Sequence, residues 1–190
     1  MHPFAASRYG TRTGVAVIAF LLGVSSARSQ DVTEPSLKAA FVYSFAKFTE
    51  WPPEVLPPSM MFTACVLGDD AVSDALAHIV KGRELGGHGI KVMRVGIEPP
   101  LRLCHLLYVS GVTSEQLTAI VAIVRGAPVL TIGDHEEFGR LGGVAHMFVE
   151  NGRVRFALNL DLARSLRLEL SSRMVTLAAR IDDGPGAAQR

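Results

Sequence analysis

The two cysteines of this chain, Cys65 and Cys104, are the residues whose type most directly suggests chemistry. They lie too far apart in the sequence for the local CxxC chemistry of redox and metal motifs. An even number of cysteines in an oxidising compartment favours a disulfide instead. Both lie in apolar, strand-like runs, residues 60–67 and 103–109, so the bond would connect two strands. Such a bond is either purely structural or a sensor whose reduction would loosen the domain.

Three consecutive titratable residues, Asp134 to Glu136, could perform acid–base catalysis, and a hydrolase is therefore one hypothesis. Asp134 has a simpler explanation as the N-cap of a short helix through Phe138. His105 follows Cys104 directly, but neighbouring residues of a strand point to opposite faces, which disfavours a shared metal ion. The sequence has no GxSxG, phosphate-loop or HExxH motif. We therefore expect a protein without an active site, a cofactor or a bound metal.

Length and composition limit the organisation of the chain. Its 190 residues, 48% of them hydrophobic, are enough for one ordinary core, so a single domain is expected. Lysine and arginine total 19 against 18 acidic residues. Because nucleic-acid binding requires a basic excess that neutralises phosphates, we do not expect nucleic acid as a partner.

The N-terminal segment has the layout of a secretory signal peptide. Two arginines precede an apolar run of ten residues, 15–24, and small residues follow it. We expect cleavage after Ala27 or Ser29, which makes residues 1–29 the signal. A retained anchor is the alternative, but the apolar run is much shorter than the roughly 20 residues that cross a bilayer. The mature protein is therefore expected to be soluble in the periplasm, without insertion into the membrane.

An aromatic-rich segment, residues 37–53, follows the signal and predicts one amphipathic helix. Its apolar side chains recur at helical spacing and form one stripe. Pro52 and the next proline end the helix by forcing Trp51 out of the α region. The helix either packs as an ordinary core element or docks a partner. The stripe consists of Leu37, Phe41, Phe45 and Phe48.

The remainder of the chain alternates between strand and helix signals, which predicts an α/β fold with a mostly parallel sheet flanked by helices. Strand signals fall at 62–67, 89–95, 103–109 and 128–132, and helix signals at 71–80, 115–124 and 134–138. Asn151-Gly152 separates two further strand-like runs, 144–149 and 154–158, and predicts a C-terminal antiparallel hairpin. Short helices are expected at 161–167 and 172–179. The single domain then spans 33–181, and 182–190 forms a disordered tail.

Several of these segments, taken in order, resemble the YfiR family. They are LKAAFVYSFAKFTEWPP (37–53), TACVLGDD (63–70), CHLLYVS (104–110), GAPVLTIGDHEEF (126–138), GGVAHMFVENGRVRFALNL (142–160) and LELSSRMVTLA (168–178). The resemblance implies a periplasmic α/β domain, commonly a homodimer. It also implies a regulator that represses a membrane-bound diguanylate cyclase of the YfiN type by binding the periplasmic domain of that enzyme.

The resemblance carries implications for individual residues. Cys65 and Cys104 match a cysteine pair that ties strands together in the family. Some members carry a second pair near 139–146, which this chain lacks, so redox tuning is not expected. Ala157 stands where the family often has Glu, so a charge contact to the cyclase could be missing. The candidate partner or dimer surface comprises Phe41, Phe45, Phe48, Trp51, Ala157, Leu166, Leu168 and Leu170.

A different class of function stays open alongside this one. The protein could instead be a periplasmic module that senses a small ligand without a cyclase partner. In an open α/β sheet, ligands bind at the carboxyl ends of the strands. The cleft would then lie near Gly68 or Ser110, each of which follows a predicted strand.

Overall fold

The computed structural model of this chain describes residues 33–98 and 100–182. The predicted signal peptide, 1–29, lies outside the described residues, and so does the predicted tail from residue 183 onward. Within the described ranges, no helix is both long enough and apolar enough to cross a membrane.

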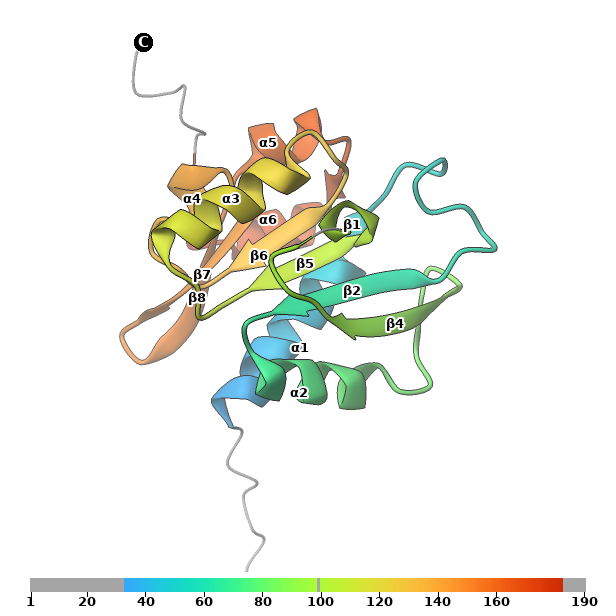
Figure 1. Cartoon of the computed structure of the whole chain (residues 1–190), viewed down its shortest axis with the longest axis horizontal. Coiled ribbons are helices and arrows are strands. Elements are labelled where there is room, and N and C mark those ends of the chain that lie inside the picture. The colour runs from blue at the N-terminus through green and yellow to red at the C-terminus, as the bar shows by residue number, and fades with distance from the viewer. Residues whose placement is uncertain (1–32, 99, 183–190) are drawn as a thin grey trace, which may run out of the picture. The chain divides into compact units, whose positions relative to one another are not determined.

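An eight-stranded sheet, in the order β10-β8-β7-β6-β5-β2-β4-β3, forms the centre of the fold (Figure 1). Its strands are β2 (Phe62–Leu67), β3 (Glu84–Leu85), β4 (His88–Arg94), β5 (Leu106–Val109), β6 (Leu130–Gly133), β7 (Ala145–Glu150), β8 (Arg153–Leu158) and β10 (Arg180–Ile181). The pairs β4–β2, β2–β5, β5–β6, β6–β7 and β8–β10 are parallel. The pairs β3–β4 and β7–β8 are antiparallel. The predicted mixed, mostly parallel sheet is therefore confirmed.

The hairpin between β7 and β8 forms where the Asn-Gly pair predicted it. Asn151 and Gly152 both have positive φ, 52° and 70°. Two successive positive φ values define the tight turn whose twist matches that of the flanking strands. The hairpin lies between two parallel pairings, β6 with β7 on one side and β8 with β10 on the other.

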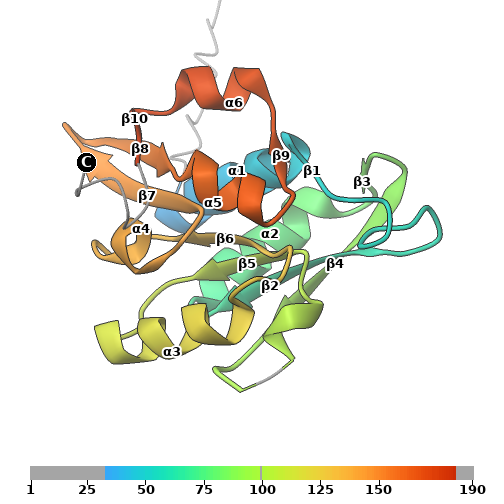
Figure 2. The same cartoon turned by 90° about the horizontal axis from the view of Figure 1, so that it is seen from above.

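Helices cover both faces of the sheet (Figure 2). They are α1 (Glu34–Lys47), α2 (Asp70–Val80), α3 (Ser114–Val124), α4 (Phe138–Leu141), α5 (Leu160–Ser165) and α6 (Ser172–Leu177), with a 3-10 turn, η1 (Leu101–Leu103). Helices α1, α2, α5 and α6 share one apolar cluster with the sheet, and α3, α4 and η1 share the other. Successive residues of β2 and β5 belong alternately to one cluster and to the other. Both faces of these strands are therefore buried, which explains why their sequences are continuous apolar runs.

The first predicted helix is shorter at its C-terminal end than the sequence suggested. Helix α1 ends at Lys47, and the chain continues as β1 (Thr49–Glu50), which pairs with β9 (Glu169–Leu170) in a separate two-stranded sheet. The backbone N–H of Ser171 also donates to the carbonyl of Phe48 at 2.9 Å. The prediction of one helix over 37–53 was wrong because hydrogen bonds to a distant segment replace those of the last helical turn.

The face that α1 buries also differs from the predicted aromatic stripe. Its fully buried residues are Ala39, Val42, Phe45 and Ala46, of which only Phe45 belongs to the stripe. Phe41 and Phe48 are half-buried. The small residues Ala39 and Ala46 lie inside the apolar cluster that α1 shares with α2 and the sheet, whereas Phe41 and Phe48 pack against that cluster from its periphery.

Candidate functional site

The half-buried aromatic side chains of α1 line a groove between α1, β8 and α6. The groove has a volume of about 230 Å³. We call it the α1–α6 groove, and its lining residues are Leu37, Ala40, Phe41, Ser44, Phe45, Phe48, Phe156, Met174 and Leu177. Every lining side chain except Ser44 is apolar. A lining of this kind suits contact with another apolar surface.

Edge-to-face aromatic pairs hold the floor of the α1–α6 groove in place. The ring of Phe156 on β8 lies 5.0 Å from that of Phe45 and 6.3 Å from that of Phe41, measured between centroids. Leu177, at the end of α6, is 65% exposed. The groove therefore combines a rigid aromatic floor with an apolar side chain that is largely open to solvent.

A second, larger groove lies beside β1, β9, α5 and α6. Its volume is about 1040 Å³, and its lining mixes apolar with charged side chains. Trp51 and Leu170 line it, together with Arg164, Arg167 and Glu54. Arg167 forms an ion pair with Glu54 across the rim. Trp51 is held in place by its indole N–H, which donates to the carbonyl of His105 at 3.2 Å.

The predicted partner surface divides into exposed and buried residues. Four of its members are core residues, each at most 9% exposed: Phe45, Ala157, Leu166 and Leu168. Of these, Phe45 still lines the α1–α6 groove and Leu168 the larger groove, whereas Ala157 and Leu166 line neither. The other four are partly exposed, and each lines a groove. Phe41 and Phe48 line the α1–α6 groove, and Trp51 and Leu170 line the larger one.

Cys65 and Cys104 form a disulfide in the structure, with their Cα atoms 5.9 Å apart. Cys65 lies on β2, whereas Cys104 follows the turn η1 and lies two positions before β5, because the predicted strand over 103–109 begins only at Leu106. Both side chains are buried, at 1% and 5% exposure. Since thiol–disulfide exchange requires a thiolate to reach a sulfur atom, the folded protein shields this bond from reductants.

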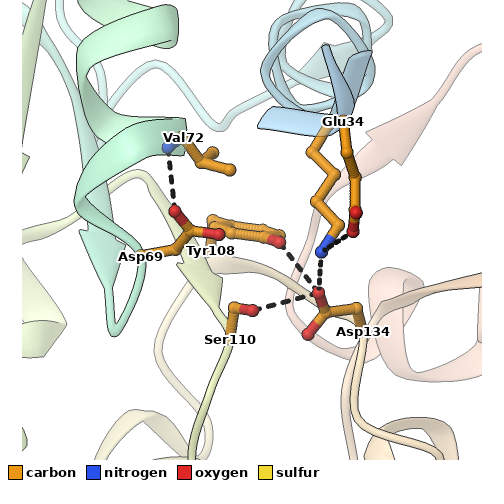
Figure 3. A network of polar contacts seen from close by, with 7 residues as sticks. Glu34, Asp69, Val72, Tyr108, Ser110 and Asp134 are labelled. Atoms are coloured by element: carbon orange, nitrogen blue, oxygen red, sulfur yellow. Dashed lines mark hydrogen bonds and ion pairs between the residues drawn. The ribbon is translucent and has the colours of Figure 1, made fainter. Parts of the chain in front are cut away.

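Asp134 is the centre of a polar network at the carboxyl ends of β5 and β6 (Figure 3). Its Oδ2 accepts from Lys38 Nζ at 2.7 Å, from the Ser110 hydroxyl at 3.0 Å and from the Tyr108 hydroxyl at 3.1 Å. Lys38 also pairs with Glu34 at 2.9 Å. Because Lys38 lies on α1, this network ties α1 to the two central strands.

The predicted capping role of Asp134 was wrong. The short helix α4 begins only at Phe138, and Glu137 occupies its N-cap position. The carboxylate of Asp134 instead accepts hydrogen bonds from side chains on α1 and β5, which are distant from it in sequence. Sequence reasoning identified Asp134 as a residue of interest but missed Lys38, Tyr108 and Ser110 as its partners. Only the sheet order brings them together.

The electrostatics of this network stabilise it rather than activate it. Burial disfavours the charged form of Lys38, but hydrogen bonds to Asp134 and Glu34 outweigh burial and raise the Lys38 pKa. Burial and the nearby carboxylate of Asp134 raise the pKa of Tyr108. At neutral pH, Lys38 is therefore a cation and Tyr108 a neutral donor. One oxygen of Asp134 is then saturated by three donors, which does not favour the hydrolase hypothesis.

Replacing Asp134 by Asn should lower the free energy of unfolding by about 2 kcal/mol. The change leaves the Lys38 ammonium without its main counter-ion, and breaking a buried pair costs roughly 3–5 kcal/mol, reduced here because the Lys38 and Asp134 side chains are 18% and 21% exposed. Urea unfolding measures the loss. Asp161→Asn, in an exposed pair with Arg164, is the control and should change stability by less than about 0.5 kcal/mol. Equal effects of the two variants would contradict the argument.

The predicted ligand cleft near Gly68 and Ser110 lies at the topological switch point of the sheet. The chain leaves β2 through α2 toward β4 and leaves β5 through α3 toward β6, so the two connections diverge there. The two loops nevertheless pack against each other directly. A Cβ atom on Gly68 would lie 1.9 Å from the carbonyl oxygen of Ser110. The space directly between these two residues is therefore filled, and the ligand cleft near Gly68 or Ser110 stays a prediction.

Two buried histidines carry no obvious catalytic role. The Nδ1 atom of His105 accepts from the backbone N–H of Thr63 at 3.0 Å, and its Nε2 lies 3.3 Å from the carbonyl of Val55. Among the described residues, the buried Nε2 of His146 has no hydrogen-bond partner. Burial lowers the pKa of both residues. Within 33–98 and 100–182, no group of three His, Cys, Asp or Glu residues could hold a metal ion.

Stability should fall as the pH drops below about 6.5. The pKa of His105 and that of His146 lie below the ordinary value of 6.5 in the folded protein, so the unfolded chain binds protons more readily there. Each histidine then contributes a slope of at most about 1.4 kcal/mol per pH unit. Urea midpoints between pH 7.5 and 5 measure this slope. His146→Phe should reduce the slope, whereas substitution of the exposed His78 by Gln should leave it unchanged. A slope that is unaffected by His146→Phe would contradict this assignment.

Comparison with known proteins decides the family of the chain. The YfiR/HmsC-like family matches residues 35–179, which is most of the sequence. The chain belongs to the YfiR/HmsC-like family. The matched residues include nearly all of α1, both cysteines and the two grooves, so the sequence resemblance is confirmed over all of the described fold except its ends, among them β10. No curated protein matches this YfiR/HmsC-like chain.

Solved structures support the fold alone. A conserved domain protein from Vibrio cholerae O1 biovar El Tor is similar with a TM-score of 0.51 and 11% identity, over 79% of this chain. The YfiR/HmsC-like chain spans only 60% of the length of that protein. An ABC domain in complex with L-Trp from Streptococcus pneumonia is less similar, with a TM-score of 0.46 and 10% identity, over 68% of this chain and 58% of the other.

Proposed function

We propose that this YfiR/HmsC-like chain is a periplasmic protein that represses a membrane-bound diguanylate cyclase by binding the periplasmic domain of that enzyme. The observation that carries the proposal is the family match over residues 35–179. The protein would act by contact and not by catalysis. Its two grooves supply surfaces for such contact.

Repression of this kind is a shift between two states of the cyclase. The chain must bind the inactive arrangement more tightly than the active one, because equal affinity for both would shift nothing. Moving the cyclase from 1:99 to 99:1 in favour of the inactive state requires about 5.5 kcal/mol of differential binding. Release of the chain would then raise cytoplasmic cyclic di-GMP without any molecule crossing the membrane.

The rigidity of the scaffold supports this mechanism. The buried Cys65–Cys104 bond ties β2 to the start of β5, and the Asp134 network ties α1 to β5 and β6. The Asp134 network holds α1, which forms one wall of the α1–α6 groove, and the disulfide restrains the sheet from its other face. A surface held in one conformation before binding loses less conformational entropy when a partner docks. The chain can therefore use most of its contact energy to select the inactive cyclase.

Cellular cyclic di-GMP tests the proposal directly. A strain that lacks the chain should contain more cyclic di-GMP than its parent, and expression of the full chain should reverse the rise. Expression of residues 30–190 alone, which lack the predicted signal peptide, should not reverse it, because the protein would remain in the cytoplasm. An unchanged cyclic di-GMP level on deletion would refute the repressor role under those growth conditions.

The larger groove favours a second candidate function, which is the sensing of a small solute. Its lining of Trp51, Leu170, Arg164 and Glu54 offers an apolar surface and charges of both signs, which suits a zwitterionic solute. A panel of free amino acids is a suitable set of probes in thermal unfolding. A solute present at 100 times its dissociation constant stabilises the folded state by about 2.7 kcal/mol. The absence of any concentration-dependent rise in Tm across the panel would count against this function.

A further inference from the structure

The α1–α6 groove has the dimensions and lining of a helix-binding site. Along α1, its lining residues run from Leu37 to Phe48, a length of roughly 16 Å at 1.5 Å per residue, or about three helical turns. Two of its three walls are themselves helices. Amphipathic helices bind apolar grooves of this kind through side chains spaced at i, i+3, i+4 and i+7.

The charges on the elements that form this groove are strongly unequal. Helix α1, strand β8 and helix α6 together carry five basic residues, Lys38, Lys47, Arg153, Arg155 and Arg173, and one acidic residue, Glu34. The whole chain, in contrast, has 19 basic and 18 acidic residues. The single acid is already paired with Lys38. Lys38 also pairs with Asp134, and Arg155 with Glu150, so within 33–98 and 100–182 the uncompensated positive charge of these three elements comes from Lys47, Arg153 and Arg173. That excess remains positive, although the protein as a whole is nearly neutral.

Two of these basic side chains lie at the rim of the groove. The ammonium group of Lys47 is 5.9 Å from the ring centroid of Phe48, which lines the groove. Arg173 is exposed and lies four positions before Leu177 on α6, so the two share a helix face. Neither Lys47 nor Arg173 forms an ion pair within 33–98 and 100–182.

We infer that the α1–α6 groove binds an amphipathic α-helix of about three turns from a partner protein, with an apolar stripe flanked by acidic residues. The apolar stripe would cover Phe41, Phe48 and Leu177, and the acidic flanks would face Lys47 and Arg173. Opposite charges at such a rim accelerate association and exclude wrong partners. The inference rests on the proposed function and deepens it, because it states the chemistry of the segment that the cyclase would present.

Two other occupants fit the structure less well. A second copy of this chain would bring its own basic α1 against the groove, and like charges facing each other oppose docking. An anionic bilayer would match the charge, but it is flat, and Phe41 and Phe48 are half-buried within a concave surface. Side chains that project from a helix can enter a groove of about 230 Å³, whereas a planar surface reaches only its rim.

Site-specific photo-crosslinking in living cells tests the inference. The full chain carries p-benzoylphenylalanine in place of Leu177 or, as the control, in place of Val149, which is similarly exposed at 71% but lies in the β7–β8 hairpin. Leu177 should cross-link to a peptide that mass spectrometry maps to an acidic amphipathic helix of another protein. Val149 should not cross-link to that helix. A cross-link from Leu177 to lipid, to a second copy or to a segment without this pattern would overturn the inference, as would the absence of any cross-link.

Charge reversal provides the second test. Lys47→Glu combined with Arg173→Glu should reduce the Leu177 cross-link at least tenfold, while circular dichroism and the urea midpoint remain those of the wild type. Arg125→Glu, at the end of α3 on the opposite face of the sheet, should leave the yield unchanged. If the wild type, the Lys47→Glu/Arg173→Glu double variant and Arg125→Glu all gave the same yield of the Leu177 cross-link, the role of charge would be overturned.

The outcomes also separate this inference from the proposed function. If deletion of the chain leaves cyclic di-GMP unchanged while Leu177 still cross-links to an acidic helix, the cyclase role fails and the groove inference stands. If deletion raises cyclic di-GMP but Leu177 makes no such cross-link, repression stands and the partner binds elsewhere.

Discussion

A variant with alanine at both Cys65 and Cys104 is expected to lose about 4 kcal/mol of unfolding free energy relative to the oxidised protein. The bond closes a loop with a sequence separation of 39, and it removes conformational entropy from the unfolded chain. Such a loss is comparable with the whole stability of many single domains, which is about 5–15 kcal/mol. The variant should therefore be only marginally folded at 37 °C.

Urea unfolding of the variant and of the oxidised wild type measures this difference. Wild-type protein unfolded in the presence of a reductant is the control, and it should approach the stability of the double variant. Under native conditions the same reductant should act slowly, because the two sulfur-bearing side chains are only 1% and 5% exposed. A loss below about 1 kcal/mol, or rapid reduction of the native protein, would contradict the structural role of this bond.

Replacement of Gly68 by Ala is expected to destabilise the fold by about 4 kcal/mol or more, at the upper end of single substitutions. The added Cβ would lie 1.9 Å from the carbonyl oxygen of Ser110. The backbone of Gly68 fixes the position of this Cβ, and the oxygen belongs to the backbone of the neighbouring loop. No side-chain rotation can therefore relieve the overlap. Gly68 also has a φ of +86°, which L-residues other than glycine rarely adopt.

Gly126→Ala is the matched control for this prediction. Gly126 has a similar positive φ, +71°, but its added Cβ would meet no atom within 4 Å. The control therefore isolates the conformational cost of a left-handed residue, which is roughly 1–2 kcal/mol. The difference between the two variants in urea unfolding reports the close approach of the loops after β2 and β5. If both variants lost the same amount, that close approach would not govern stability.

Local patterns in the sequence determined most of the secondary structure. The strand and helix signals from Phe62 to Val124 match β2, α2, β4, β5 and α3 within a few residues, because each element is apolar on the faces that it buries. The hairpin followed from Asn151-Gly152, whose positive φ values only a few residue types tolerate. The antiparallel end of the sheet could therefore be predicted from two residues and their apolar flanks.

Features that depend on partners distant in sequence could not be predicted. Helix α1 ends at Lys47 because β1 pairs with β9, more than a hundred residues later. Asp134 has the sequence context of a helix cap, yet it accepts hydrogen bonds from Lys38 and Tyr108. In both cases the local pattern is typical of the predicted structure, but hydrogen bonds to a distant segment took its place.

The sequence by itself determined the family, the α/β alternation and the pair of cysteines. It did so because apolar periodicity, turn chemistry and the order of the segments that resemble the family are properties that the chain carries before folding. The tertiary structure decided which apolar side chains remain open to a partner. Ala157 and Leu166 are buried in the core, whereas Phe48 and Leu177 line the α1–α6 groove. Residues of the same chemical type diverge in this way because exposure depends on the elements packed against each of them, and the sheet order and the packing of α1 and α6 set those neighbours.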